Sequence, residues 1–111
     1  MEISFTNKKL ATLCNSEAKL RGKHGPRMAK LIGQRLFELS AAETLEAMRF
    51  LPAARCHELT ANLKWHLAVD LVHPDRLAFK PDYETIPKKP DGGLDWEKVK
   101  KIIVVGIGDY H

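Results

Sequence analysis

The sequence predicts an α+β domain in which N-terminal helices pack on one face of a small antiparallel sheet. Residues 28–39 carry apolar side chains at helical spacing, which places them on one stripe of a helix. Residues 65–71 instead alternate apolar and polar side chains, as a half-buried strand does. Residues 101–107 are apolar on both faces of the pleat, which favours a central strand. Helices followed by a group of strands indicate the α+β class.

The N-terminal third is expected to form a strand and a helical hairpin. Ile3 and Phe5 alternate with polar neighbours, which predicts a short opening strand. Helical spacing begins at Lys8, and Asn15-Ser16 should interrupt it because both side chains compete for backbone hydrogen bonds. Gly25-Pro26 should end this helix and start the next, since proline is tolerated in a first helical turn.

Capping and turn residues delimit the remaining elements. Ser40-Ala41-Ala42-Glu43 has the pattern of a capping box, so a third short helix is expected from there to Leu51. Two further strands are expected at residues 55–59 and 76–79, on either side of 65–71 in the chain. Residues 81–97 are rich in Pro, Gly, Lys and Asp, and no regular element is expected in them.

Length and composition narrow the class of protein. The 111 residues are enough for one domain, 1–111, and 44% hydrophobic residues can form one core. No apolar run approaches the roughly 20 residues that span a bilayer, and no signal peptide is visible at the start, so we expect a cytoplasmic protein without a membrane partner. Cys14 and Cys56 suit a reducing compartment and lack zinc-site spacing, so neither a metal nor another cofactor is expected.

Positive charge is concentrated in the first third of the chain. The net charge is +4, and residues 1–39 hold eight Lys or Arg against three Glu. One cationic face is therefore expected, which favours an anionic partner, although an ordinary solvated helix surface would have the same composition. The eight cations are Lys8, Lys9, Lys19, Arg21, Lys23, Arg27, Lys30 and Arg35.

Two segments could carry chemistry. His57 lies in the expected strand 55–59, where it is either a structural histidine or a group that exchanges protons near neutral pH. The terminal Asp109-Tyr110-His111 follows the expected central strand: an imidazole can transfer protons, a tyrosine ring can stack on a base, and a carboxylate can orient an imidazole. A frayed tail is the alternative for this second segment.

The chain resembles HigB-like toxins of the RelE/ParE superfamily, the toxins of type II toxin–antitoxin modules. The resemblance covers nearly the whole chain, because its motifs recur in the same order and at similar spacing. They are Phe5-Thr6-Asn7-Lys8-Lys9-Leu10, Leu13-Cys14-Asn15-Ser16-Glu17, Arg55-Cys56-His57-Glu58-Leu59, Val69-Asp70-Leu71, Arg76-Leu77-Ala78-Phe79, Asp91-Gly92-Gly93-Leu94-Asp95-Trp96 and Asp109-Tyr110-His111.

This resemblance implies a compact microbial RNase fold and metal-independent, ribosome-dependent cleavage of mRNA, which inhibits translation. The implied catalytic residues are His57, Asp109, Tyr110 and His111, with Lys64 and Arg76 binding RNA. The implied partners are the ribosome, mRNA and a HigA-like helix-turn-helix antitoxin, with the toxin alone a monomer.

One turn departs from the family pattern. Relatives commonly carry Lys-Gly-Asp-Arg after the histidine strand, whereas this chain has Thr60-Ala61-Asn62-Leu63 followed by Lys64. Two alternatives stay open: a degenerate homologue that binds only antitoxin or RNA, which the altered turn favours, and a ParE-like toxin that inhibits by binding, against which His57 and Asp109-Tyr110-His111 argue.

Overall fold

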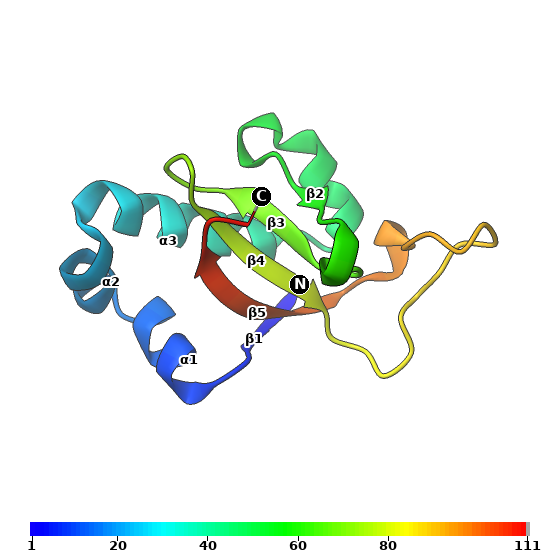
Figure 1. Ribbon diagram of the computed structural model, residues 1–111, viewed down its shortest axis with the longest axis horizontal. Helices are drawn as coiled ribbons and strands as arrows, with labels where there is room; N and C mark the ends of the chain where they lie inside the picture. The colour runs from blue at the N-terminus through cyan, green and yellow to red at the C-terminus, as the bar shows by residue number, and fades with distance from the viewer. Residues whose placement is uncertain (111) are drawn as a thin grey trace.

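A five-stranded sheet forms the centre of the computed structural model, which describes residues 1–110 (Figure 1). The strand order is β1-β5-β4-β3-β2. The strands are β1 (Glu2–Phe5), β2 (His57–Glu58), β3 (Leu67–Asp70), β4 (Arg76–Pro81) and β5 (Lys101–Gly108). The α-helices are α1 (Lys8–Cys14), α2 (Glu17–His24) and α3 (Pro26–Ala41), and four 3-10 helices are η1 (Leu45–Phe50), η2 (Pro52–Ala54), η3 (Ala61–Leu63) and η4 (Trp96–Lys98).

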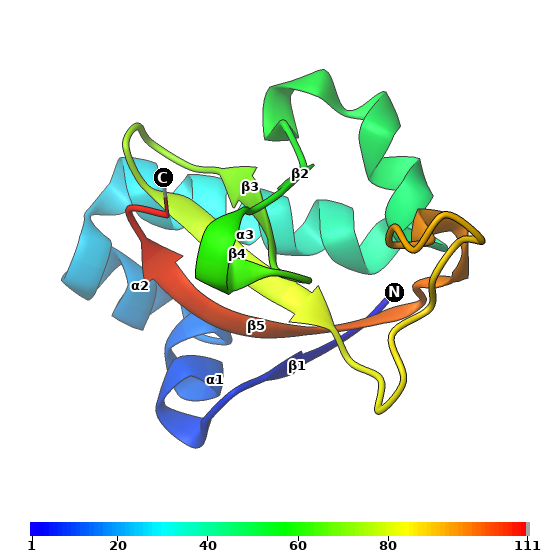
Figure 2. The same cartoon turned by 45° about the vertical axis from the view of Figure 1, so that its right-hand side comes forward.

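Helix α3 covers one face of the sheet, and the expected α+β class is confirmed. It runs behind β3 and β4, while η3 and the C-terminal tail lie on the opposite side (Figures 1 and 2). Ile32 and Leu39 of α3 are fully buried in the same apolar cluster as Leu77 and Phe79 of β4. The opposite face of the sheet is therefore the one on which a functional site can open to solvent.

The helix boundaries at both predicted breaks are confirmed, and each has a local cause. The Ser16 side chain accepts a hydrogen bond from the Lys19 amide and so caps α2, which is separated from α1 by only two residues. Gly25 has φ 84°, a left-handed conformation that favours glycine, and Pro26 occupies the first turn of α3. The N-terminal segment is thus divided into two short helices and one long helix.

The sheet is mixed, whereas an antiparallel sheet was expected. β1 pairs in parallel with β5, while β5, β4, β3 and β2 form an antiparallel series. Parallel neighbours need a long crossover between them, and almost the whole chain separates β1 from β5. The alternation of apolar and polar residues identifies strands but does not show whether two strands pair in parallel or antiparallel. The parallel pairing of β1 could therefore not be predicted from the sequence pattern.

Three local predictions were wrong. Ser40 caps no helix: α3 continues to Ala41, the Ser40 hydroxyl donates to the Phe37 carbonyl, and the next helical turns begin only at Leu45. Strand β3 is also shorter than predicted and is buried on both faces, because Leu67, Ala68 and Val69 are all inaccessible. The strand at 55–59 is reduced to the two residues of β2.

Arg35 was expected among the surface cations, but it is a buried structural residue. Its side chain is 6% exposed and its guanidinium donates to the Asp70 carbonyl at 2.8 Å, the Ala53 carbonyl at 3.0 Å and the Glu38 carboxylate at 2.9 Å. These bonds tie α3 to the end of β3 and to η2. Arg35 therefore does not belong to the cationic face.

Replacing Arg35 should destabilise the fold much more than replacing a neighbouring exposed arginine. Arg35→Ala would remove the ionic partner of the half-buried Glu38 carboxylate and the donor to two carbonyls, which should cost about 3–5 kcal/mol in the free energy of unfolding. Arg27→Ala, at an exposed position of the same helix, should change it by less than about 0.5 kcal/mol. Urea unfolding followed by circular dichroism measures both, and equal values would contradict this role for Arg35.

Candidate active site

A groove of about 360 Å³ opens beside the short strand β2. His57 reaches it from β2, Arg76 from the start of β4, and Tyr110 from the C-terminal tail. The turn at residues 60–63 forms another part of its wall. Three segments that are far apart in the sequence thus place an imidazole, a guanidinium and a phenol around one hollow.

The hydrogen bonds of His57 define its tautomer. An Arg76 guanidinium nitrogen, Nη1, lies 3.2 Å from His57 Nε2, and the Arg55 carbonyl lies 2.7 Å from His57 Nδ1. A guanidinium can only donate, so Nε2 is the acceptor and the proton sits on Nδ1. In this contact the lone pair of His57 Nε2 is directed at the arginine.

Asp70 anchors two arginines at this groove. Its carboxylate accepts from Arg55 Nε at 2.8 Å and from Arg55 Nη2 at 3.2 Å, and it lies 3.4 Å from Arg76 Nε. Partial burial raises the pKa of the Asp70 carboxyl, but the hydrogen bond and charge of Arg55, followed by the charge of Arg76, outweigh it and lower that pKa. Asp70 therefore stays ionised and holds Arg76 toward His57.

The C-terminal tail is folded back onto the sheet. Arg76 Nη1 donates to the Tyr110 carbonyl at 2.7 Å, and the Tyr110 hydroxyl occupies the space that a Cβ on Gly106 would need. The register between β4 and β5 shifts beside this contact, because Ala78 faces Gly106 while Phe79 faces Val104. A bulge of this kind bends the end of a strand. Glycine at position 106 leaves room for the Tyr110 ring.

The turn that departs from the family pattern keeps a glycine-like backbone without the glycine. Ala61 has φ 59° and Trp65 has φ 69°, both in the left-handed region. Such a conformation costs a non-glycine residue roughly 1–2 kcal/mol. The surrounding residues therefore hold the turn in this conformation. Compared with Lys-Gly-Asp-Arg, the turn lacks the two cationic side chains rather than the backbone shape.

Lys88 brings a cation from the long loop back to this turn. Its ammonium lies 5.3 Å from the centre of the Trp65 ring, and that of Lys64 lies 4.9 Å from the same centre. Both distances allow a cation–π contact. Two lysines from distant parts of the chain therefore meet at one tryptophan, directly after the residues that line the groove.

The residues proposed from the sequence do not all meet in the groove. His57, Arg76 and Tyr110 lie together, whereas Lys64 is exposed beside Trp65 rather than among the lining residues. Asp109 is exposed next to Tyr110. His111 lies outside the described residues.

Sequence reasoning missed the parts played by Asp70 and Arg55, whereas Lys88 and Lys89 could be named as substitutes for the charge missing from the turn. Arg55 and Asp70 become neighbours only through the pairing of β2 with β3. Nothing in the sequence around either residue indicates that the two form an ion pair. Burial chiefly raises the pKa of the Cys56 thiol to about 12, with Arg49 opposing the rise and Glu58 adding to it, and a raised pKa disfavours the thiolate form that a nucleophile needs. Within residues 1–110 no cluster of His, Cys, Asp and Glu could hold a metal ion.

Comparison of the chain with protein-family models, with curated proteins and with solved structures gave no match. Among the described residues, no helix is both long and apolar enough to cross a membrane.

The stability contributed by Asp70 should depend on pH in a defined direction. Its pKa is lower in the folded chain than the ordinary 3.8, so the ionised carboxylate stabilises the fold above 3.8, and this stabilisation is lost as the pH falls through the folded pKa. Asp70→Asn should therefore be less stable than the natural chain at neutral pH, with the gap closing below pH 3.8. Urea unfolding across this range measures the gap. Glu84→Gln, at an exposed loop position, is the control, and a gap that stayed constant at acid pH would contradict the prediction.

Proposed function

We propose that this protein is a HigB-like toxin, a metal-independent endoribonuclease that cuts mRNA on the ribosome and is neutralised by a helix-turn-helix antitoxin. The observation that carries the proposal is the pairing of the His57 imidazole with the Arg76 guanidinium in an open groove. The family resemblance of the motifs supplies the substrate class. The geometry supplies a chemical route that is consistent with it.

Cleavage of RNA without a metal requires three events at one phosphate. The 2′-hydroxyl loses its proton and attacks phosphorus, charge develops on the non-bridging oxygens, and the departing 5′-oxygen gains a proton. His57 Nε2 has the free lone pair that a base needs once Arg76 turns to the phosphate. Arg76 then binds the non-bridging oxygens, and His111 or another acid protonates the leaving oxygen.

Tyr110 and Asp70 support this arrangement. The Tyr110 ring lies at the groove, where it can stack on or orient a nucleotide. Asp70 binds Arg76 through Nε, the guanidinium nitrogen other than the one that meets His57. A phosphate could therefore take the place of His57 on Nη1 without Arg76 losing its anchor. The contact of Arg76 with His57 can thus be exchanged for a phosphate, while its contact with Asp70 is kept.

A second candidate is a binding-only homologue, either a ParE-like toxin or a protein that contacts only antitoxin or RNA. The observation that favours it is the turn, where Thr60 and Leu63 line the groove in place of cations. In such a protein the contacts of Arg76 would serve stability alone. The two candidates differ in whether mRNA is cut.

Replacing His57 should abolish cleavage and leave the fold intact. His57→Ala removes the base, and His57→Gln keeps a possible acceptor for Arg76 but cannot take up a proton. Loss of one proton-transfer group should lower the cleavage rate about 10²–10⁴-fold in both variants. The assay maps the 5′ ends of mRNA after incubation with programmed ribosomes, with melting temperature as the folding control. A natural chain that arrests growth on expression without cutting mRNA would favour the binding-only candidate. Rapid cutting by both variants would remove His57 from the mechanism.

The lysines at Trp65 should carry the RNA affinity that the turn has lost. A hydrogen bond from a charged donor is worth about 1.5–3 kcal/mol, so Lys64→Ala and Lys88→Ala should each slow cleavage roughly tenfold or more. Lys89→Ala is the matched control, because Lys89 lies 3.8 Å from Asp91 instead. Replacing Thr60-Ala61-Asn62-Leu63 by Lys-Gly-Asp-Arg should raise the rate. Unchanged rates in both lysine variants, on the same programmed ribosomes, would exclude this role.

A further inference from the structure

The segment that joins β4 to β5 has, apart from Lys88, no part in the reaction proposed above, although it contains the motif Asp91-Gly92-Gly93-Leu94-Asp95-Trp96. It extends away from the sheet and returns at η4 (Figure 1). Its two halves are tied together, because Lys88 and Leu94 form an antiparallel bridge. The hairpin formed by residues 87–96, called the arm, therefore has a defined shape and ends on Trp96.

Trp96 connects the arm to the strand that carries His57. Trp96 is 5% exposed, and the Arg49 guanidinium lies 3.8 Å from the centre of its ring. Its indole Nε1 donates to the Glu58 carboxylate at 3.1 Å. An indole has this one donor and no acceptor. Packing thus fixes the ring, and its hydrogen bond is directed at β2.

The strand β2 benefits from such support because it is short and lies at the edge of the sheet. It consists of His57 and Glu58 and pairs with β3 on one side. Successive side chains of a strand point to opposite faces. His57 therefore meets Arg76 on one face, while Glu58 meets Trp96 on the other. The two hydrogen bonds hold the same two residues from both sides.

The arm also reaches the turn that follows β2. The Lys88 ammonium, near the start of the arm, lies 5.3 Å from the centre of the Trp65 ring. The two ends of the arm thus contact the strand and the turn of one hairpin, and His57 belongs to that hairpin.

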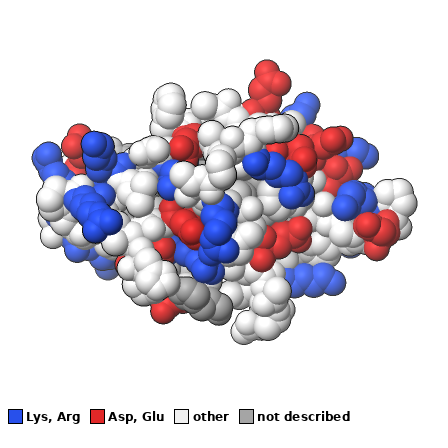
Figure 3. All heavy atoms as spheres, turned by 90° about the horizontal axis from the view of Figure 1, so that it is seen from above, with Lys and Arg blue, Asp and Glu red and all other residues white. Residues whose placement is uncertain are grey.

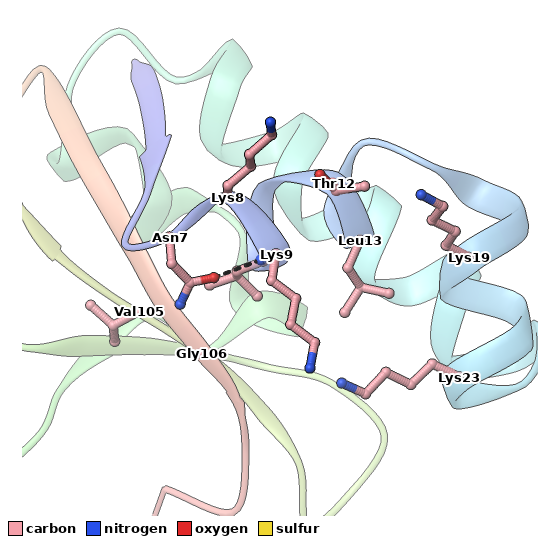
Figure 4. Close-up of a pocket in the computed structure, with 10 residues that line it drawn as sticks. Asn7, Lys8, Lys9, Thr12, Leu13, Lys19, Lys23, Val105 and Gly106 are labelled. Carbon is pink, nitrogen blue, oxygen red and sulfur yellow. Dashed lines mark hydrogen bonds between the residues drawn. The ribbon is translucent and has the colours of Figure 1, made fainter.

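The distribution of charge favours an internal role for the arm over the recruitment of an anionic partner. Seen from above, Lys and Arg side chains gather at the end that carries α2, whereas basic and acidic side chains alternate over the rest of that face (Figure 3). A lysine-rich hollow of about 710 Å³ lies between α1, α2 and β5 and shares no lining residue with the groove at His57 (Figure 4). In the arm, by contrast, Lys89 lies 3.8 Å from Asp91.

We propose that Trp96 is a positioning residue, whose hydrogen bond to Glu58 holds β2 so that His57 Nε2 stays in contact with Arg76. The inference rests on the proposed function only for its effect on cleavage, because the state of the imidazole can be measured without RNA. It gives the arm the task of supporting the strand that bears the base.

The test compares variants that remove this hydrogen bond with one that disturbs only the core. Trp96→Phe removes the N–H donor and keeps an aromatic ring against Arg49, and Glu58→Ala removes the acceptor at an exposed position. Glu58→Gln keeps an oxygen that can accept. Val99→Ala, at a fully buried position beyond the arm, is the control for general destabilisation. Melting temperatures show whether each full-length variant is folded, and Glu58→Ala decides the matter if Trp96→Phe is not.

The first readout is the tautomer of His57 in long-range nitrogen–proton correlation spectra, with the signal assigned by its absence in His57→Gln. The proton should stay on Nδ1 in the natural chain, in Glu58→Gln and in Val99→Ala. In Trp96→Phe and Glu58→Ala both tautomers should appear, because the imidazole leaves the Arg76 donor that selects one of them.

The second readout is cleavage on programmed ribosomes. In Trp96→Phe and Glu58→Ala the maximal rate should fall about tenfold or more, because a displaced base is poorly aligned for attack. KM should change less than about twofold, since the cations that bind RNA remain. Glu58→Gln should restore most of the rate. The double variant Trp96→Phe with Glu58→Ala should be no slower than either single variant, because both remove the same hydrogen bond.

Three results would overturn the proposal. The first is an unchanged His57 signal in both Trp96→Phe and Glu58→Ala. The second is an equal change in Val99→Ala, which would attribute the effect to a general loosening of the fold. The third is a double variant much slower than either single variant, which would mean that Trp96 and Glu58 act independently. If the natural chain does not cut mRNA, the proposed function fails, and the His57 spectra alone decide whether Trp96 positions the imidazole.

Discussion

The Arg76 guanidinium joins the elements that form the groove. Through one nitrogen it reaches His57 and the Tyr110 carbonyl, and through another it meets the Asp70 carboxylate. It is only 13% exposed, so these contacts are poorly screened by water. Without Arg76, the short strand β2 and the tail would have no shared partner, and Asp70 would face Arg55 alone. The groove is thus one electrostatic unit assembled from four segments of the chain.

Sequence patterns identified the elements better than their arrangement. The breaks before α2 and α3 were predictable because capping serine and glycine-proline act within a few residues. The parallel pairing of β1 with β5 was not, since nothing in the alternation of β1 encodes its direction. Arg35 was misjudged for a related reason: it lies off the apolar stripe of α3, and its burial depends on carbonyls of β3 and η2.

The residue types of the candidate site were predictable, but the hydrogen bonds and ion pairs between them were less so. His57, Arg76 and Tyr110 could be proposed from motifs, and the fold brings these three together. The support from Asp70 could not be foreseen, because a contact across fifteen residues of chain depends on strand register. The altered turn shows the opposite case. Its lost charges were visible in the sequence, whereas the retained left-handed backbone at Ala61 and the approach of Lys88 were not.

The place of β5 in the sheet has a consequence for biosynthesis. β5 lies between β1 and β4, although it is the last strand along the chain. A chain emerging from the ribosome therefore exposes the edges of β1 and β4 until residues 101–108 are made, and unpaired edges promote aggregation. The antiparallel hairpin of β3 and β4 can form earlier, since its contacts are local. The sheet is completed in a late step, which also brings the tail with Tyr110 to the groove. Until that step, the nascent chain has His57 and Arg76 but no finished site.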